Sequence, residues 1–228
     1  MSNAYTDFVI SDSQNPPSPP PLAPQQERSR KTLDLLLQAT IRTLDAEGLE
    51  ACTLPRVAAA AGVSTATVYR RFEDKDALLR AAFLHVLQQS NRGNQAALEK
   101  LLLRPKLEDT AERLIAALLQ QYRAHPRLLR ALSQFLQTHA GTEFSRQALS
   151  LIATNLQLTA AVLLHHRDRI RHPDPQRAVT FAVLNAASTI EAIVFEAESL
   201  WHTALPLSDK QLSAELTRSL IAYLRRRP

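Results

Sequence analysis

Residues 52–83 read CTLPRVAAAAGVSTATVYRRFEDKDALLRAAF, and this stretch decides the fold that we expect. Thr53 can cap a short helix with Pro55 in its first turn, where a proline is tolerated because its missing N–H would have no helical partner. Gly62 supplies the left-handed backbone of a tight turn, and Ser64 can cap the next short helix. Two short helices joined by a three- or four-residue turn that contains glycine form a helix-turn-helix unit.

The second helix of such a unit enters the major groove of DNA, and the first lies across the DNA backbone. Hydroxyl groups can bond to bases or phosphates there, and lysine or arginine adds positive charge. Lys75 begins the following helix, where its charge and the free backbone N–H groups together favour a phosphate. The residues that we predict to bind DNA are Thr53, Ser64, Thr65, Thr67, Tyr69, Arg70, Arg71 and Lys75.

Each of these assignments has a structural alternative. Thr53 can be a helix cap alone, or a cap that also touches a phosphate. The hydroxyl and guanidinium groups of the second helix can instead occupy a plain solvated surface. Apolar side chains of the same stretch are expected in the core rather than at the site, namely Val57, Val63, Val68, Phe72 and Leu78.

Roughly residues 28–90 resemble the DNA-binding region of the TetR (tetracycline-repressor-like) family of transcriptional regulators. The matches to the family pattern follow in register: Gly48, Thr53 through Ala58, Ala61-Gly62-Val63-Ser64, Thr67-Val68-Tyr69, Phe72, Asp74-Lys75 and Leu78-Leu79. Two positions depart from the pattern, since Ala66 replaces a frequent glycine and Arg71 the usual histidine. Both changes alter groups that can face DNA, so the operator of a relative cannot be transferred to this chain.

The resemblance implies a repressor that a small-molecule effector releases from a palindromic double-stranded DNA operator. It also implies a homodimer that forms through the last two long helices, near residues 175–200 and 209–226. An activator, or a regulator that requires its ligand to bind DNA, would have the same sequence features. A helical interaction module without DNA binding is the alternative from another functional class, and an enzyme is a third.

Proline and glycine divide the chain into segments with helical apolar spacing, and no segment has the alternation of a strand. We therefore expect an all-α fold of about nine helices. Six of the thirteen prolines lie in residues 11–26, so residues 1–26 are expected to form a disordered tail. Residues 27–74 are expected to form the helix-turn-helix domain, and 75–228 a helical effector-binding and dimerisation domain. Expected helices are 29–47, 54–61, 65–71, 75–91, 107–124, 127–139, 143–169, 175–200 and 209–226.

The C-terminal part carries no motif of comparable specificity. Small residues at Ala178, Ala182 and Ala186 suit either a close helix contact in a dimer or the interior of one subunit. Glu191 follows a long uncharged stretch, and it can pair with a ligand or with an arginine across the dimer. Aromatic and polar candidates for an effector pocket are Tyr122, Phe135, His139, Phe181, Asn185 and Trp201, each with a core or interface role as its alternative.

Composition limits the remaining classes. A net charge of +5 suits a polyanionic partner, although a mildly basic soluble protein has the same total. Cys52 is the only cysteine, which excludes an intrachain disulfide and fits a reducing cytoplasm. The first ten residues lack the pattern of a signal peptide. The uncharged run 147–166 is long enough to span a bilayer, but its polar residues favour a helix buried in protein.

No phosphate-binding loop, dinucleotide-binding glycine motif or nucleophile motif occurs in the sequence. The histidines of the segment HHRDRIRH, residues 165–172, have no cysteine or carboxylate that completes a zinc ligand set. We therefore expect no enzymatic activity, no cofactor, no metal and no membrane partner.

Overall fold

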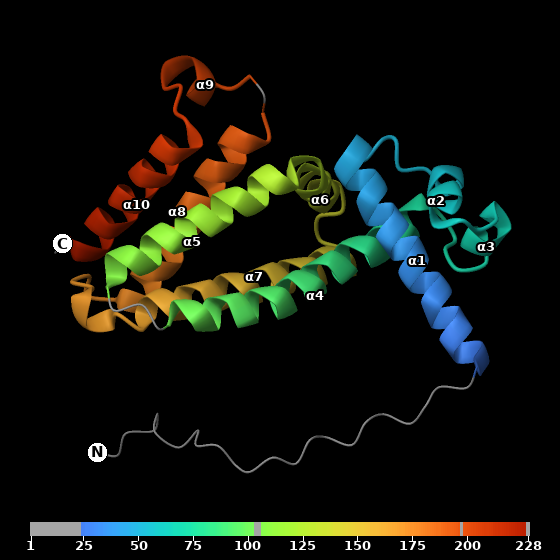
Figure 1. Ribbon diagram of the computed structural model, residues 1–228, viewed down its shortest axis with the longest axis horizontal. Coiled ribbons are helices and arrows are strands. Elements are labelled where there is room, and N and C mark those ends of the chain that lie inside the picture. The colour runs from blue at the N-terminus through green and yellow to red at the C-terminus, as the bar shows by residue number, and fades with distance from the viewer. Residues whose placement is uncertain (1–23, 103–105, 197, 227–228) are drawn as a thin grey trace, which may run out of the picture. The chain divides into compact units, whose positions relative to one another are not determined.

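The computed structural model describes residues 24–102, 106–196 and 198–226, and within them every regular element is a helix (Figure 1). The first four helices are α1 (Pro24–Glu47), α2 (Leu54–Ala61), α3 (Thr65–Tyr69) and α4 (Lys75–Leu101). They are followed by α5 (Leu107–Ala124), α6 (Pro126–Thr138), α7 (Glu143–Leu164) and the 3₁₀ turn η1 (Arg167–Arg169). The last three are α8 (Pro175–Val194), α9 (Leu200–Ala204) and α10 (Asp209–Arg225). The all-α fold is confirmed, with ten α-helices in the described ranges where about nine were expected.

The chain divides into two compact units, residues 1–34 and 35–228. The described part of the first unit is the N-terminal portion of α1, in which Lys31 forms an ion pair with Glu27. Most of the predicted disordered tail, residues 1–26, lies outside the described residues, although α1 already begins at Pro24. The predicted boundary between a DNA-binding domain and an effector domain near residue 74 stays a prediction.

The turn between α2 and α3 has the hydrogen bonds that its sequence predicts. Gly62 lies at φ +66°, and its N–H donates to the carbonyl of Ala59. The N–H of Val63 reaches back to the carbonyl of Ala58, which completes a Schellman-type helix end. Val68, in the second half of α3, has no exposed surface, so one buried side chain anchors this five-residue helix. Of the predicted core residues, Val57, Val68, Phe72 and Leu78 are buried, and Val63 is half-buried.

The C-terminal core is formed by α5, α7, α8 and α10, which contact one another in pairs. Figure 1 shows α7 running beside α4, and these two helices also contact each other. On α8 the small side chains Ala178, Ala182 and Ala186 are buried in this core. Of the two interpretations of these alanines, the interior of one subunit is therefore the correct one. The opposite face of α8 exposes Phe181 and Leu184, which are 56% and 48% accessible.

Several helix ends differ from the expected ones. Helix α1 begins at Pro24 rather than residue 29, α3 ends at Tyr69 rather than 71, and α7 ends at Leu164 rather than 169. Helix α4 continues through Gly93 to Leu101, since one glycine costs a long helix only about 1 kcal/mol relative to alanine. Helix α8 ends at Val194 rather than near residue 200, and the short helix α9 follows separately. Asp174 caps α8, and Ser208 forms a capping box with Gln211 on α10.

Helices α7 and α8 are long and apolar enough to cross a membrane by length and composition. In the apolar windows of these helices, 22% and 44% of the residues respectively are buried inside the chain. A helix buried in a protein core meets the same test, and one face of α8 lies in the C-terminal core. The sequence predicted that α7 is a helix buried in protein, but only 22% of its apolar window is buried within a single chain.

The Gly62 turn is open to a direct stability test. A Cβ at Gly62 would meet no atom within 4 Å, so Gly62→Ala should destabilise through its left-handed backbone alone, by about 1–2 kcal/mol. The matched control is Gly93→Ala, which also meets no atom within 4 Å and lies in the middle of α4. That variant should be more stable than the parent chain by up to about 1 kcal/mol. Urea unfolding of both variants checks the prediction, and equal effects of the same sign would contradict it.

The buried Cys52 thiol gives a second test. Burial raises the pKa of this thiol to about 11, with nearby Lys75 acting against the rise and Glu47 adding to it. Only the thiolate reacts with alkylating reagents, so the folded protein should react far more slowly at pH 8 than a free cysteine does. The rate should increase as pH approaches 11 or when urea unfolds the chain. A rate at pH 8 equal to that of the unfolded chain would contradict the burial of this thiol.

Candidate functional site

Three polar side chains of the turn and α3 form one hydrogen-bonded row. The Ser64 hydroxyl accepts from the backbone N–H of Thr67 at 3.2 Å, and the two hydroxyl oxygens are 2.9 Å apart. The Arg70 guanidinium donates to the Thr67 hydroxyl at 3.2 Å. Ser64 and Arg70 are exposed and Thr67 is half-buried, so the row lies at the surface with its rotamers already held. Such a row can present hydroxyl and guanidinium donors to bases or phosphates with little further ordering.

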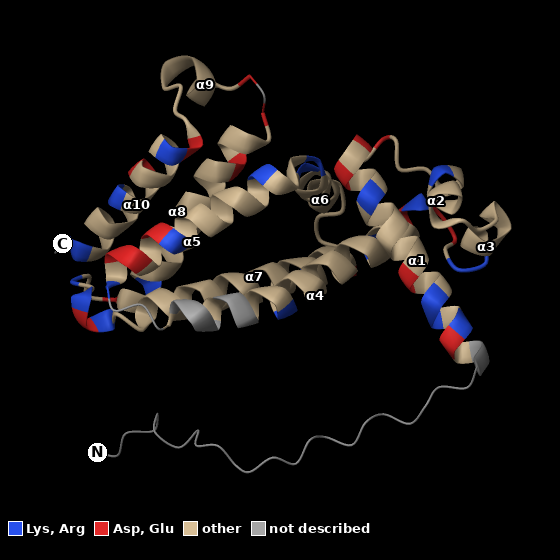
Figure 2. Ribbon diagram, in the orientation of Figure 1, with Lys and Arg blue, Asp and Glu red and all other residues tan. Residues whose placement is uncertain are grey.

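The other predicted side chains of α3 surround this row. Tyr69 is 57% exposed, so its ring and hydroxyl are accessible at the end of α3. Thr65 and Arg71 are half-buried. Figure 2 shows basic residues at the end of α3 and acidic residues in the turn that leads to α4. Positive charge is therefore local to the helix end and does not extend across the whole unit.

Lys75 and the start of α4 differ from the expected arrangement. The Lys75 ammonium donates to the carbonyl of Leu49 at 2.8 Å, which ties α4 to the turn that follows α1. The Asp74 carboxylate accepts from the backbone N–H of Ala77 at 2.6 Å, so an acidic side chain already occupies the helix start. An ammonium group has three donor protons, and two remain after the bond to Leu49. Lys75 therefore has a structural contact that the sequence did not predict. Its contact with a DNA phosphate stays a prediction.

Thr53 caps α2, as both of its interpretations require. Its side chain accepts from the backbone N–H of Arg56 at 3.4 Å, and its own surface is exposed. Arg56 is paired with Glu47 at 2.5 Å, which joins α2 to the end of α1. A phosphate contact of Thr53 is compatible with this geometry and stays a prediction.

Helix α6 joins the helix-turn-helix region to the C-terminal core at both of its ends. At the first end, His125 Nδ1 lies 2.8 Å from Asp45 Oδ2, and Arg127 donates to the carbonyl of Ala46 near the end of α1. At the other end, His139 Nε2 lies 3.1 Å from Asp76 Oδ2 of α4. The His139 ring also stacks on Phe135, with centroids 3.9 Å apart. A displacement of α6 would therefore act on α1 and α4 together.

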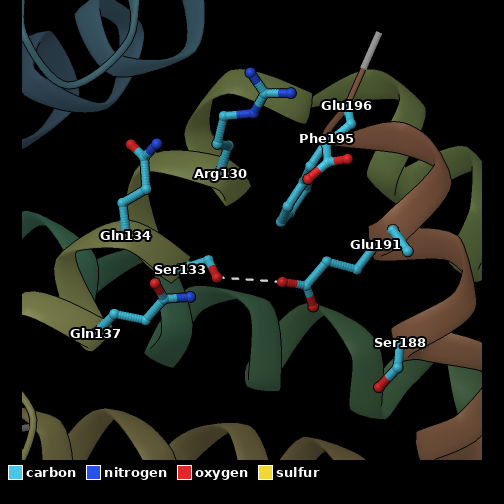
Figure 3. Close-up of a pocket in the computed structure, with 9 residues that line it drawn as sticks. Arg130, Ser133, Gln134, Gln137, Ser188, Glu191, Phe195 and Glu196 are labelled. Carbon is cyan, nitrogen blue, oxygen red and sulfur yellow. Dashed lines mark hydrogen bonds between the residues drawn. The ribbon is translucent and has the colours of Figure 1, made fainter. Parts of the chain in front are cut away.

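An open cavity of about 670 Å³ lies between α6 and the C-terminal end of α8 (Figure 3). Four polar side chains of α6 form one wall, namely Arg130, Ser133, Gln134 and Gln137. Glu191, Phe195 and Glu196 form the facing wall. The Ser133 hydroxyl donates to Glu191 Oε1 across the cavity at 3.2 Å. A volume of this order accommodates a small organic molecule.

The residues predicted for an effector pocket are dispersed in the structure. Phe135 is buried against Phe83 and Phe144, and His139 packs beside it, so both lie in the junction of α6 with α4 and α7. Phe181 and Asn185 are exposed on α8, and Trp201 lies on α9 at 39% exposure. Tyr122 lies beside the cavity, because its ring stacks on Phe195 with centroids 5.7 Å apart. Ligand contact of these six residues stays a prediction.

Sequence reasoning missed the α6 wall of the cavity. Arg130, Ser133, Gln134 and Gln137 recur at helical spacing, so they form one polar row on a helix whose other face is apolar. This polar row is the sequence signal that could have indicated the cavity wall. A second polar row, on α7, is exposed to water and consists of Gln147, Ser150, Thr154 and Gln157.

The histidine-rich segment after α7 has a structural role for one member. His166 is buried, and its Nε2 lies 2.9 Å from the hydroxyl of Thr110 on α5. Burial is the main cause that lowers the pKa of His166, followed by the charges of His165 and Arg169. Across the part of the chain that the structure describes, no three His, Cys, Asp or Glu side chains are grouped as metal ligands would be.

The N-terminal region of the chain is similar in sequence to known bacterial regulators. Residues 36–82 match the family model of "Bacterial regulatory proteins, tetR family". The HTH-type transcriptional regulator BetI of Paraburkholderia phytofirmans is 44% identical over 66 residues, which are 27% of this chain and 34% of that protein. BetI of Burkholderia thailandensis is 47% identical over 53 residues, 23% of this chain and 27% of the relative. The matched region thus spans about a third or less of the length of these curated relatives.

Solved structures extend the likeness to the fold of nearly the whole chain. A TetR-family transcriptional regulator of Mesorhizobium loti MAFF303099 aligns with 86% of this chain and 96% of its own, with a TM-score of 0.64 and 21% identity. The transcriptional regulator FadR of Bacillus subtilis, solved with stearoyl-CoA, aligns with 84% and 97%, with a TM-score of 0.58 and 16% identity. Residues 36–82 therefore match the tetR family of bacterial regulatory proteins, and the solved structures show that the chain shares its helical fold with regulators of that family.

Proposed function

We propose that this protein is a cytoplasmic, dimeric transcriptional repressor that a small-molecule effector releases from a palindromic DNA operator. The observation that carries the proposal is the surface row of Ser64, Thr67 and Arg70, whose donors are fixed in place before any partner is bound. Exposed Tyr69 adds a hydroxyl beside that row at the end of α3. In a helix-turn-helix, these are the positions that meet the major groove and its phosphates.

Dimerisation is proposed through the exposed face of α8 together with α10. Phe181 and Leu184 expose large apolar side chains there, and the Phe181 ring lies 5.4 Å from that of Tyr223 on α10. Burial of such a face against a second copy would remove apolar surface from water. Two copies related by a two-fold axis would present two α3 helices, which suits an operator with inverted half-sites.

Effector response is proposed to act through α6. One face of α6 lines the cavity, while His125, Arg127 and His139 at its two ends contact α1 and α4. An effector that binds better to one position of α6 than to another would shift the population toward that position. Because α1 and α4 flank the helix-turn-helix, such a shift would alter the spacing of the two α3 helices in a dimer.

The DNA-binding proposal is tested first by selection from a randomised duplex library at two salt concentrations. We expect an inverted repeat to be enriched, with binding that weakens steeply as salt rises. Failure of the folded, dimeric chain to enrich any sequence, with and without metabolite extracts, would favour the helical interaction module instead.

The selected operator then allows a one-atom test of α3. Tyr69→Phe removes only the hydroxyl, and we expect operator affinity to fall about tenfold, which corresponds to roughly 1.4 kcal/mol. The matched control is Ser150→Ala on α7, which also removes one exposed hydroxyl and should bind the operator as the parent chain does. Fluorescence anisotropy on the labelled operator measures both variants. Equal affinities of all three proteins would remove Tyr69 from the DNA interface.

The dimer interface has a matched pair of exposed leucines as its test. Leu184→Glu places a charge on the proposed face of α8 and should convert the dimer to a monomer at micromolar concentration. Leu149→Glu on α7 changes a side chain of similar exposure and should leave the dimer intact. Light scattering after size-exclusion chromatography gives the mass of each. A monomer for Leu149→Glu and a dimer for Leu184→Glu would move the interface to α7.

A further inference from the structure

The cavity between α6 and α8 has more negative than positive charge among its lining side chains. Glu191 and Glu196 each contribute a carboxylate, and Arg130 contributes the one cation of the lining that the structure describes. Figure 3 shows the Arg130 guanidinium pointing away from the Glu191 carboxylate. No ion pair within 4 Å joins Arg130 to either glutamate in the described structure. Glu191 therefore faces the cavity without a basic partner.

Glu191 is half-buried and incompletely satisfied. One of its oxygens accepts from the Ser133 hydroxyl at 3.2 Å, and no other hydrogen bond to this side chain is present among the described residues. An ionised carboxylate can accept about four hydrogen bonds, so most of its capacity faces the cavity and its water. A partly desolvated carboxylate in this state gains most from a group that brings positive charge.

An aromatic wall stands beside this carboxylate. Figure 3 shows the Phe195 ring directed into the cavity, and the ring stacks on Tyr122 behind it. Burial, and next the charge of Glu191, raise the pKa of Tyr122 to about 12, so its hydroxyl stays protonated at neutral pH. The faces of aromatic rings attract cations, and the attraction grows when water is excluded. A carboxylate with an aromatic ring beside it is a recurring arrangement for substituted ammonium groups.

A neighbouring hollow of about 310 Å³ has the opposite charge. It shares Arg130 and Glu196 with the cavity and adds Arg123 and Arg127. Arg123 is already paired with Asp209, and Arg127 donates to the carbonyl of Ala46. Arg123 and Arg127 line this hollow and not the cavity, so a cation would be disfavoured in the hollow relative to the Glu191 wall.

We infer that the cavity binds a small organic cation, an alkylammonium compound, with Glu191 as its counter-ion and Phe195 as its aromatic wall. This assigns the chemical class of the effector and rests on the proposed function. The class differs from that of stearoyl-CoA, the molecule bound to the FadR of Bacillus subtilis. A ligand with several phosphates would meet two uncompensated carboxylates here.

Three probes of equal chain length and different charge test the inference: hexylammonium, hexan-1-ol and hexanoate. Isothermal titration calorimetry on the full chain should give the tightest binding for hexylammonium, about tenfold tighter than for hexan-1-ol, with hexanoate weakest. Glu191→Gln keeps the shape of the side chain and should reduce hexylammonium affinity to that of hexan-1-ol. The matched control is Glu112→Gln on α5, an exposed glutamate outside the cavity with the same change of charge.

A second variant keeps the inference testable if Glu191→Gln impairs folding. Phe195→Leu removes the aromatic face and should weaken hexylammonium several-fold while leaving hexan-1-ol nearly unchanged. Hexan-1-ol or hexanoate binding as tightly as hexylammonium would overturn the inference, and so would equal hexylammonium affinities of the parent chain and Glu191→Gln.

Operator binding without any probe separates this inference from the proposed function. If the parent chain binds an operator but shows no preference for hexylammonium, only the ligand class is wrong. If hexylammonium binds in a Glu191-dependent way and no operator is found, the cavity assignment stands and the repressor proposal fails.

Discussion

The helix-turn-helix of this chain depends on the burial of one side chain, Val68, beneath a five-residue helix. A helix this short is not stable alone, because forming its first turn costs more conformational entropy than its few hydrogen bonds return. Burial of Val68 supplies the tertiary contact, the Gly62 turn sets the direction of entry, and Ser64 satisfies an N–H at the start. Every polar group of α3 that can meet DNA is positioned by these three features.

The contrast between the two halves of the chain shows which structural signals are local. The caps at Thr53 and Ser64, the left-handed Gly62 and the buried Val68 each follow from residues within a few positions, so sequence alone predicted this region nearly to the residue. In the C-terminal half, spacing placed three alanines of α8 on one face. It could not say whether that face met the same chain or another, and the structure puts it in the core of the same chain.

The cavity was beyond sequence prediction for a related reason. Its walls come from α6 and the end of α8, about sixty residues apart in the case of Ser133 and Glu191, and no pattern in either helix specifies how they meet. The end of α8 also was misplaced, since no proline or glycine marks residue 194. Glu191 alone gave a hint, as a charge that follows an uncharged stretch. Tyr122 was selected for its aromatic ring and lies behind the cavity wall against Phe195.

Two of the contacts that hold the helix-turn-helix in place are made to the main chain. Arg127 donates to the carbonyl of Ala46, and Lys75 to the carbonyl of Leu49. A carbonyl is present whatever residue occupies the position, so mutational drift at these two acceptor positions would leave both contacts intact. The donors Arg127 and Lys75 have no such freedom. Over evolutionary time the end of α1 and the turn after it can therefore change in sequence while both contacts persist. A helix-turn-helix from a distant homologue can be grafted here if it keeps the same backbone path.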